Sequence, residues 1–228
     1  MRITELHLYT RELNAQRIFY TRTLGLPLMA ETTTSFSLLA GATRLVFQRT
    51  DQEGLLYHFA FSVPANKVIQ AKAWLQARTP PIPLLSQDGQ DTFYGKTWNV
   101  DSVYFYDASG NILEFIGHYD LPAEPADSFS EQDILHISEI GMAFDDVAAQ
   151  VSAFKERLGI EPYKGQTSEN FTAMGDIDGL FIVVKRGRFW FPTEMDAAVL
   201  APVEVVIGGT GNQHYHVSPY PYEIEVLS

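Results

Sequence analysis

The chain of 228 residues contains no cysteine. This absence excludes disulfide bonds, thiolate metal ligands and a cysteine nucleophile. Charged residues are also scarce, at 19 % of the chain, which argues against long disordered segments. The 16 basic residues are outnumbered by 28 acidic ones, and the resulting net charge of −12 disfavours both nucleic acid and anionic membrane surfaces as partners.

Long hydrophobic runs are missing as well, since no apolar segment approaches the roughly 20 residues that span a bilayer. The first ten residues, MRITELHLYT, enter a strand-like pattern directly and lack the apolar core of a signal peptide. We therefore expect a cytoplasmic protein with no membrane partner. Apolar residues make up 46 % of the chain, enough for a packed core, and the length suits one large domain or two small ones.

An internal repeat organises the chain. Residues 3–25 and residues 137–159 match at a constant offset, and each block predicts a strand, a turn and an amphipathic helix that ends at Leu-Gly. Glycine after the last helical turn supplies the left-handed conformation that ends a helix. Three short strand candidates follow the first block: LPLMAE, SFSLLA and TRLVFQR. This order of elements is a βαβββ unit.

A second βαβββ unit follows in residues 56–118. The strand LYHFAFSV leads to a helix at 66–78, which a cluster of prolines ends, and the turn DASGN separates the last two strands of the unit. A third unit occupies about 137–187. The remainder holds the strand candidates VEVVIGG and YEIEVLS and is interpreted as a fourth unit reduced to strands.

These units predict an α+β fold in which tandem βαβββ units form cupped mixed β-sheets. We expect residues 1–118 to form one such sheet, with helices near 13–24 and 66–78 on its convex side. The expected domains are a paired-unit, metal-binding domain at 1–120 and a degenerate domain without metal ligands at 134–228. Residues 121–133, with two prolines, four acids and no apolar periodicity, are interpreted as a linker.

Three residues on predicted strands are candidate metal ligands: His7, His58 and Glu114. Strand alternation places each of them on the face turned away from the helices. Two imidazoles and a carboxylate bind a divalent metal and leave positions open for a substrate. A single histidine on a strand is more often a satisfied core or surface residue. Two histidines that begin successive units, with a glutamate on the last strand of the second, favour the metal site.

At these positions the chain resembles the vicinal oxygen chelate superfamily, the group of glyoxalases, bleomycin-binding proteins, fosfomycin-resistance proteins and extradiol dioxygenases. The segment YFYDASGNILE (104–114) is similar to the family's ending, in which an aspartate, a glycine and a glutamate ligand follow at fixed spacing; Ala108 stands where the family usually has proline. The family's ligands lie on the first strand of each unit and the last strand of the second. The resemblance therefore implies His7, His58 and Glu114 as the ligands.

The resemblance also implies three protein ligands rather than four. Glyoxalases of this family carry a fourth ligand at the position of Val46, which cannot bind metal. In the third unit Gly141 occupies the place of His7, so we interpret that half as a cap or pocket wall. The aromatic segment RFWFP (189–193) is a candidate contact at the pocket opening. Fe²⁺ or Mn²⁺ is the favoured metal, with Zn²⁺ or Ni²⁺ as alternatives.

Two further residues are candidate catalytic groups. Tyr104 lies where ring-cleaving family members carry a tyrosine that contacts the substrate, although it also suits strand packing. Glu5 shares a strand face with His7 and is a candidate base or an anchor for that ligand. Its repeat counterpart Glu139 weakens the catalytic interpretation. No histidine occurs in 40–50 or 94–102, where ring-cleaving relatives carry acid–base histidines, which argues against catechol cleavage.

The sequence thus predicts a metal-dependent enzyme that acts on a small oxygen-rich substrate by dioxygenase-like or by lyase or isomerase chemistry. The alternative is a binding module that sequesters a small molecule without catalysis. In either case the expected partner is a small molecule, and the protein is expected to be a monomer or a homodimer. His214 and His216, two apart on a predicted strand, are a weaker metal-binding pair.

Overall fold

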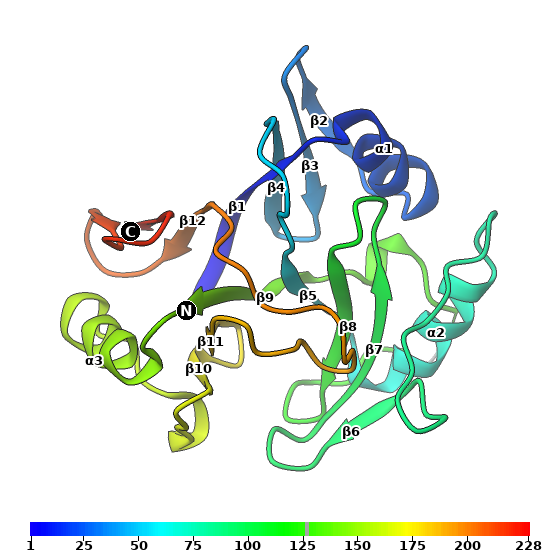
Figure 1. Cartoon of the computed structure of the whole chain (residues 1–228). Coiled ribbons are helices and arrows are strands. Elements are labelled where there is room, and N and C mark those ends of the chain that lie inside the picture. The colour runs from blue at the N-terminus through cyan, green and yellow to red at the C-terminus, as the bar shows by residue number, and fades with distance from the viewer. Residues whose placement is uncertain (126–127) are drawn as a thin grey trace.

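The computed structural model describes residues 1–125 and 128–228, and its strands form two seven-stranded mixed sheets (Figure 1). Sheet A consists, in spatial order, of β13 (Gln213–His216), β14 (Tyr222–Leu227), β12 (Val203–Gly208), β1 (Arg2–Thr10), β4 (Thr43–Arg49), β3 (Ser35–Ala40) and β2 (Leu28–Glu31). Sheet B consists of β10 (Phe171–Asp176), β11 (Gly179–Lys185), β9 (His136–Phe144), β5 (His58–Ser62), β8 (Ile112–His118), β7 (Val100–Tyr106) and β6 (Phe93–Gly95).

The helices lie in the segments predicted for the first three βαβββ units. They are α1 (Leu13–Ile18), continued as a π-helix by Phe19–Thr23, then α2 (Val68–Gln76) and α3 (Val147–Leu158). Helix α1 contacts β3 and β4, α2 contacts β7 and β8, and α3 contacts β10 and β11 (Figure 1). Within the described ranges, no helix has the length and apolar character needed to cross a membrane.

Helix α3 begins and ends where the repeat predicts, because capping residues occur at both of its ends. The Asp146 carboxylate accepts a hydrogen bond of 2.9 Å from the Ala149 backbone N–H, which caps the first turn. Gly159 ends the helix in the left-handed conformation, with φ of 65°. Part of the predicted linker, residues 126 and 127, lies outside the described residues. Its last residues, Glu131–Asp133, form a short 3₁₀ turn.

The pairing of the units differs from the expectation. The α+β fold built from βαβββ units is confirmed, but the prediction that residues 1–118 form one cupped sheet is wrong. The first unit lies in sheet A, where β1 pairs antiparallel with β12 of the reduced fourth unit. The second unit lies in sheet B, where β5 pairs antiparallel with β9 of the third unit. The first strands of all units have similar apolar patterns, so the sequence does not specify which two pair edge to edge.

The apolar faces of both sheets meet in one core. Large side chains of sheet B, among them Phe59, Phe61 and Phe115, are fully buried together with Leu6 and Leu8 of β1. Complete burial of one such side chain contributes about 1.5–3 kcal/mol to the free energy of unfolding. The alternation expected for β5 and β8 is confirmed, because the residues between these core positions point to the opposite face of sheet B.

Hydrogen bonds connect the two sheets at the turn that precedes β8. The buried Asp107 carboxylate accepts bonds from the side chains of Gln16 and Tyr20, at 2.6 and 2.9 Å, and so ties this turn to the α1 segment. It also accepts bonds from the Asn111 amide and the Ser109 backbone N–H. These contacts satisfy the buried carboxylate and hold the strand that carries Glu114.

The cross-pairing of the units predicts that residues 1–120 cannot fold alone. Such a fragment lacks β12, the neighbour of β1, and β9, the neighbour of β5. One edge of β1 and one edge of β5 are then left without a hydrogen-bonded strand. We expect no cooperative transition when the fragment is titrated with urea and followed by circular dichroism, whereas the full chain unfolds cooperatively. A sigmoidal transition of the isolated fragment would contradict the observed pairing.

Candidate metal centre

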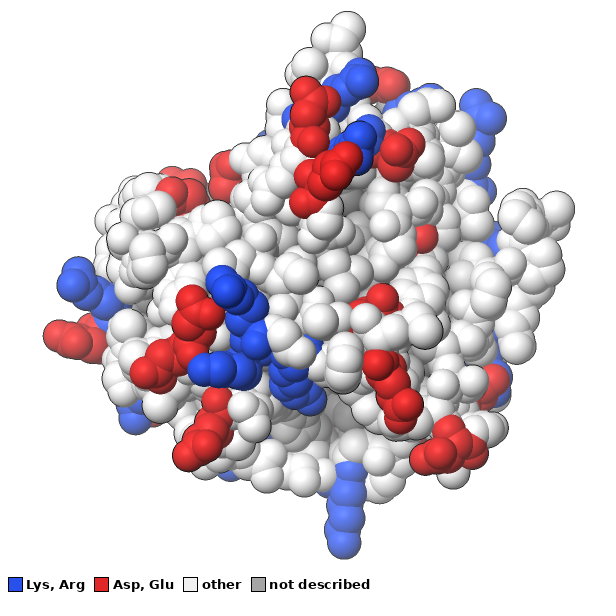
Figure 2. All heavy atoms as spheres, viewed as in Figure 1, with Lys and Arg blue, Asp and Glu red and all other residues white. Residues whose placement is uncertain are grey.

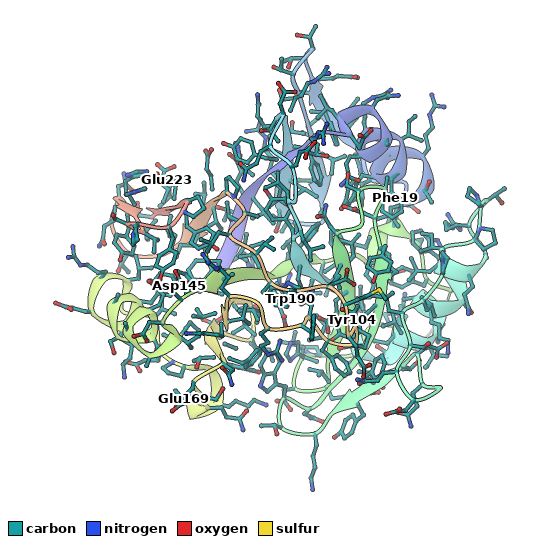
Figure 3. The ribbon with its side chains drawn as sticks, in the orientation of Figure 1. Phe19, Tyr104, Asp145, Glu169, Trp190 and Glu223 are labelled. Atoms are coloured by element: carbon teal, nitrogen blue, oxygen red, sulfur yellow. The ribbon has the colours of Figure 1, made fainter. Side chains whose placement is uncertain are left out.

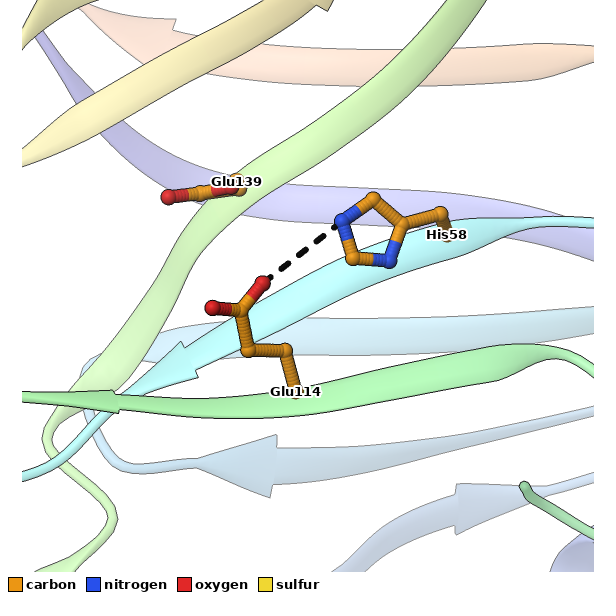
Figure 4. Close-up of side chains that lie close together, drawn as sticks. All are labelled: His58, Glu114 and Glu139. Carbon is orange, nitrogen blue, oxygen red and sulfur yellow. Dashed lines mark ion pairs between the residues drawn. The ribbon is translucent and has the colours of Figure 1, made fainter. Parts of the chain in front are cut away.

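Three adjacent strands of sheet B bring two carboxyl groups and an imidazole together. In the strand register Ala60 of β5 lies between Glu114 of β8 and Glu139 of β9. Directly paired residues of neighbouring strands share a face of the sheet, so both glutamates point the same way. His58, two residues before Ala60, shares that face. One potential ligand atom from each of His58, Glu114 and Glu139 lies within 4.8 Å of the other two (Figure 4).

All three side chains are buried, with residual exposures of 6 % for His58 and 3 % for each glutamate. Among the described residues this is the one group of three or more His, Asp or Glu side chains whose ligand atoms approach so closely. Burial of ionisable groups without compensation is unfavourable. A cluster of this kind therefore indicates a site for an ion or a proton-transfer function.

The imidazole of His58 is oriented by the backbone of the neighbouring strand. Its Nδ1 donates a hydrogen bond of 3.2 Å to the carbonyl oxygen of Ile112, which leaves the Nε2 lone pair directed at the carboxyl groups. Burial, and to a smaller extent the positive charge of Arg188, lowers the pKa of His58 to about 4. The imidazole is therefore neutral at pH 7, the form that binds metal.

The two carboxyl groups are held in an environment that favours their protonated forms. Burial raises the pKa of Glu114 to about 7, against the opposing effect of hydrogen bonds from Ser102 and Tyr104. Burial and the nearby charge of Glu114 raise the pKa of Glu139 well above its usual range. The 3.6 Å contact between His58 Nε2 and Glu114 Oε2 therefore joins a neutral imidazole to a carboxyl group whose protonated form is favoured by burial.

The cluster lies in the wall of a cavity of about 430 Å³. Tyr104 of β7 and Trp190 flank His58, with ring centroids 6.2 and 4.9 Å from the imidazole (Figure 3). Trp190 belongs to the segment 186–202, orange in Figure 1, which connects β11 to β12 across the cavity. The predicted position of the RFWFP segment at the pocket is confirmed for Trp190 and Phe191, whereas Phe189 is 52 % exposed.

Gly141 makes room for this covering segment. A Cβ at Gly141 would lie 2.5 Å from a ring atom of Trp190, a distance that the close packing of the indole does not allow. The glycine that replaces His7 in the repeat therefore admits an aromatic side chain beside His58.

The structure brings His58, Glu114 and Tyr104 together and places His7 and Glu5 elsewhere. His7 lies on β1 of sheet A, where its Nε2 is 2.5 Å from a carboxylate oxygen of Glu5. Arg44 donates a bond of 2.8 Å to the other oxygen of Glu5. The expected convergence of His7 with the other two ligands does not occur, because β1 pairs with β4 and β12 instead of with a strand of sheet B.

Glu139 takes the third place in the cluster, although the sequence analysis assigned it no role. The signal was present, because Glu139 and Glu5 occupy equivalent positions of the repeat. That equivalence was interpreted as evidence against a function for Glu5. The register of β9 against β5, which local sequence does not specify, turns the same position into a neighbour of His58.

The cluster fits a divalent metal ion. Ligand bonds of about 2.0–2.2 Å place neighbouring donor atoms roughly 3.0–3.5 Å apart. The observed 3.6 Å between His58 Nε2 and Glu114 Oε2 requires only a small adjustment. The Oε1 atom of Glu139 is buried and has no hydrogen-bond partner among the described residues, as expected of an atom that awaits a cation.

No protein-family model matches the sequence, and no curated protein matches it. Solved structures do resemble the fold. A putative dioxygenase from Bacillus subtilis is 13 % identical and aligns over 99 % of this chain and 85 % of its own, with a TM-score of 0.60. The V278E mutant of glyoxalase I from Zea mays is 11 % identical and aligns over 99 % of this chain and 91 % of its own, with a TM-score of 0.59.

Likeness at such low identity establishes the fold and not the activity. It agrees with the resemblance based on the YFYDASGNILE segment and on the βαβββ units. The chain therefore has the fold of these two structures, a putative dioxygenase and a glyoxalase I.

Proposed function

We propose that this protein is a metal-dependent enzyme in which His58, Glu114 and Glu139 hold a divalent cation and a small oxygen-rich substrate binds beside them. The buried cluster of one imidazole and two carboxyl groups in the cavity wall carries this proposal. One nitrogen and several oxygen donors suit Fe²⁺, Mn²⁺, Zn²⁺ or Ni²⁺. When bound, such a cation polarises a substrate carbonyl and increases the acidity of the adjacent carbon.

The residues of the cavity support proton-transfer chemistry, as in an isomerase or lyase. A general base needs a raised pKa and an accessible lone pair. The pKa of Glu139 lies well above the usual range for a carboxyl, and its side chain lines the cavity. In this scheme Oε1 of Glu139 would hold the cation, and the second carboxylate oxygen would take a proton from the substrate and return it to another atom.

Tyr104 and Ser102 have supporting roles in this scheme. Both donate hydrogen bonds to Glu114 and so fix the orientation of its carboxylate. The pKa of Tyr104 is raised far above its usual range, first by burial and then by the charges of the two glutamates, which keeps its hydroxyl protonated as a donor. Among the described residues that line the cavity, His58 is the one histidine. This composition favours carboxylate-mediated proton transfer over histidine-assisted ring cleavage.

The metal-binding assignment is tested with His58→Ala and His7→Ala. Removal of His58 deletes the one nitrogen donor, and we expect the affinity for Zn²⁺ or Mn²⁺ to fall by more than about 100-fold in calorimetric titrations. His7→Ala is the matched control and should bind metal like the parent chain, because His7 lies in sheet A. Equal loss in both variants, or loss in His7→Ala alone, would contradict the assignment.

Metal binding should be strongly coupled to pH. Both carboxyl groups must lose their protons to bind a cation. The pKa of Glu114 is raised to about 7 and that of Glu139 is raised as well, so protons are displaced at neutral pH and affinity falls as pH falls. We expect a decrease of about 10-fold or more between pH 8 and pH 6. Calorimetry at pH 6.5 in two buffers of different ionisation enthalpy should show release of more than one proton per cation, and a pH-independent affinity is the opposing result.

The proton-transfer assignment is tested with hydroxyacetone, a small probe with two vicinal oxygens. In D₂O the metal-loaded protein should exchange the carbon-bound protons next to the carbonyl faster than the free metal does, as measured by proton NMR. Glu139→Gln removes the base, and the exchange rate should fall by about 100-fold or more. Glu5→Gln, at the equivalent position of the repeat, is the control and should leave the rate unchanged. No exchange by a metal-loaded parent chain would contradict this chemistry.

A further inference from the structure

Arg188 is a cation without a carboxylate partner in the wall of the cavity. It follows β11 in the covering segment and is half-buried. Its guanidinium donates a bond of 3.0 Å to the carbonyl oxygen of Phe189 and lies 5.2 Å from the ring centre of Phe171. In residues 1–125 and 128–228, no carboxylate lies within ion-pair distance of it, whereas nearby Arg186 approaches Asp145 at 3.4 Å. A half-buried guanidinium of this kind is suited to an anionic ligand.

The charge of the cavity points in the same direction. A divalent cation and the two ionised glutamates of the cluster sum to zero, so the charge of Arg188 remains uncompensated. Lys96 at the cavity wall adds a second positive charge. Figure 2 shows Lys and Arg side chains beside a hollow on this face of the molecule, with Asp and Glu side chains next to them. Two basic side chains, Arg188 and Lys96, thus line this cavity in a chain whose net charge is −12.

The remaining walls are aromatic. Phe191 packs edge-on against Phe93, with ring centroids 4.7 Å apart. Trp98 and Phe171 also line the cavity, and their ring centroids are 6.2 Å apart. Trp190 covers the metal-ligand cluster. Flat aromatic surfaces on several sides favour a planar ring. The volume of about 430 Å³ lies within the range of small-molecule sites.

From these contacts we infer that the ligand of the cavity is a planar aromatic carboxylate whose anionic group pairs with Arg188 while its ring lies between the aromatic walls. The inference deepens the proposed function, because it names the substrate class of the same cavity. It also stands without the metal, since Arg188 and the aromatic side chains belong to the chain itself. Arg188 is then the residue that selects acids over neutral compounds.

The test compares benzoate with benzamide, a planar neutral analogue of almost the same shape. Trp98 and Trp190 line the cavity, so binding is followed by quenching of tryptophan fluorescence excited at 295 nm. The titrations use the full chain at pH 6 with EDTA, so that no metal can bind the carboxylate. We expect benzoate to bind about 10-fold or more tightly than benzamide, which matches the strength of a charge-assisted hydrogen bond. Cyclohexanecarboxylate, an anion without a planar ring, should bind more weakly than benzoate.

Arg188→Gln should abolish the preference for benzoate and leave the affinity for benzamide unchanged. Arg188→Lys should restore part of the preference. Arg186→Gln, which removes a paired arginine two residues away, should retain it in full. Zn²⁺ binding by Arg188→Gln, measured by calorimetry, verifies that the variant keeps its fold and its metal site.

Three results would overturn the inference: equal affinity of the parent chain for benzoate and benzamide, an unchanged preference in Arg188→Gln, or loss of the preference in Arg186→Gln. Failure of the proposed function has a different signature. If the parent chain binds no metal, the metalloenzyme proposal is wrong, while a benzoate preference that depends on Arg188 still stands.

Discussion

Burial of three ionisable side chains on one face of three neighbouring strands is the constraint on which the rest of this structure depends. Their side chains are almost fully buried, and His58 and Glu114 each receive specific partners from the protein. The carbonyl of Ile112 fixes the imidazole, and Ser102 and Tyr104 fix one carboxyl group. The strands that provide these partners must therefore remain in register, which the fully buried core on the other face of sheet B ensures.

The two sheets show how one repeat can serve two purposes. In sheet A, His7 and Glu5 satisfy one another and Arg44 completes the contact, while the side chains remain partly exposed. On β13, His214 and His216 are exposed and both approach Glu223. In sheet B the equivalent strand face is closed by a covering segment, and its polar groups lack such complete pairing. Enclosure by the covering segment, more than residue type, distinguishes the candidate site in sheet B from the His7 and Glu5 pair in sheet A.

The segment that encloses the site is anchored at several points. Tyr106 and Asp196 approach closely, with 2.5 Å between the phenol and carboxylate oxygens, which ties the segment to β7. The indole of Trp190 occupies the space above Gly141. Tyr222 of β14 bonds to both backbone groups of Ala143 on β9, so sheet A and sheet B are also connected beside the segment's strands β11 and β12. The cavity is thus a product of both halves of the chain and not of one domain with an appended cap.

Local sequence patterns determined the secondary structure, because alternation of apolar residues, helix caps and turn residues act over a few positions. The repeat, the helix ending at Gly159, the faces of β5 and β8, and the candidacy of His58 and Glu114 all follow from such patterns. Edge-to-edge pairing of the first strands joins residues about 80 positions apart, as Ala60 and Glu139 show, and similar apolar strands do not specify their partners. Only the tertiary structure decided that β5 pairs with β9, which excludes His7 from the cluster and admits Glu139, because hydrogen-bonded register and burial are properties of the assembled sheet.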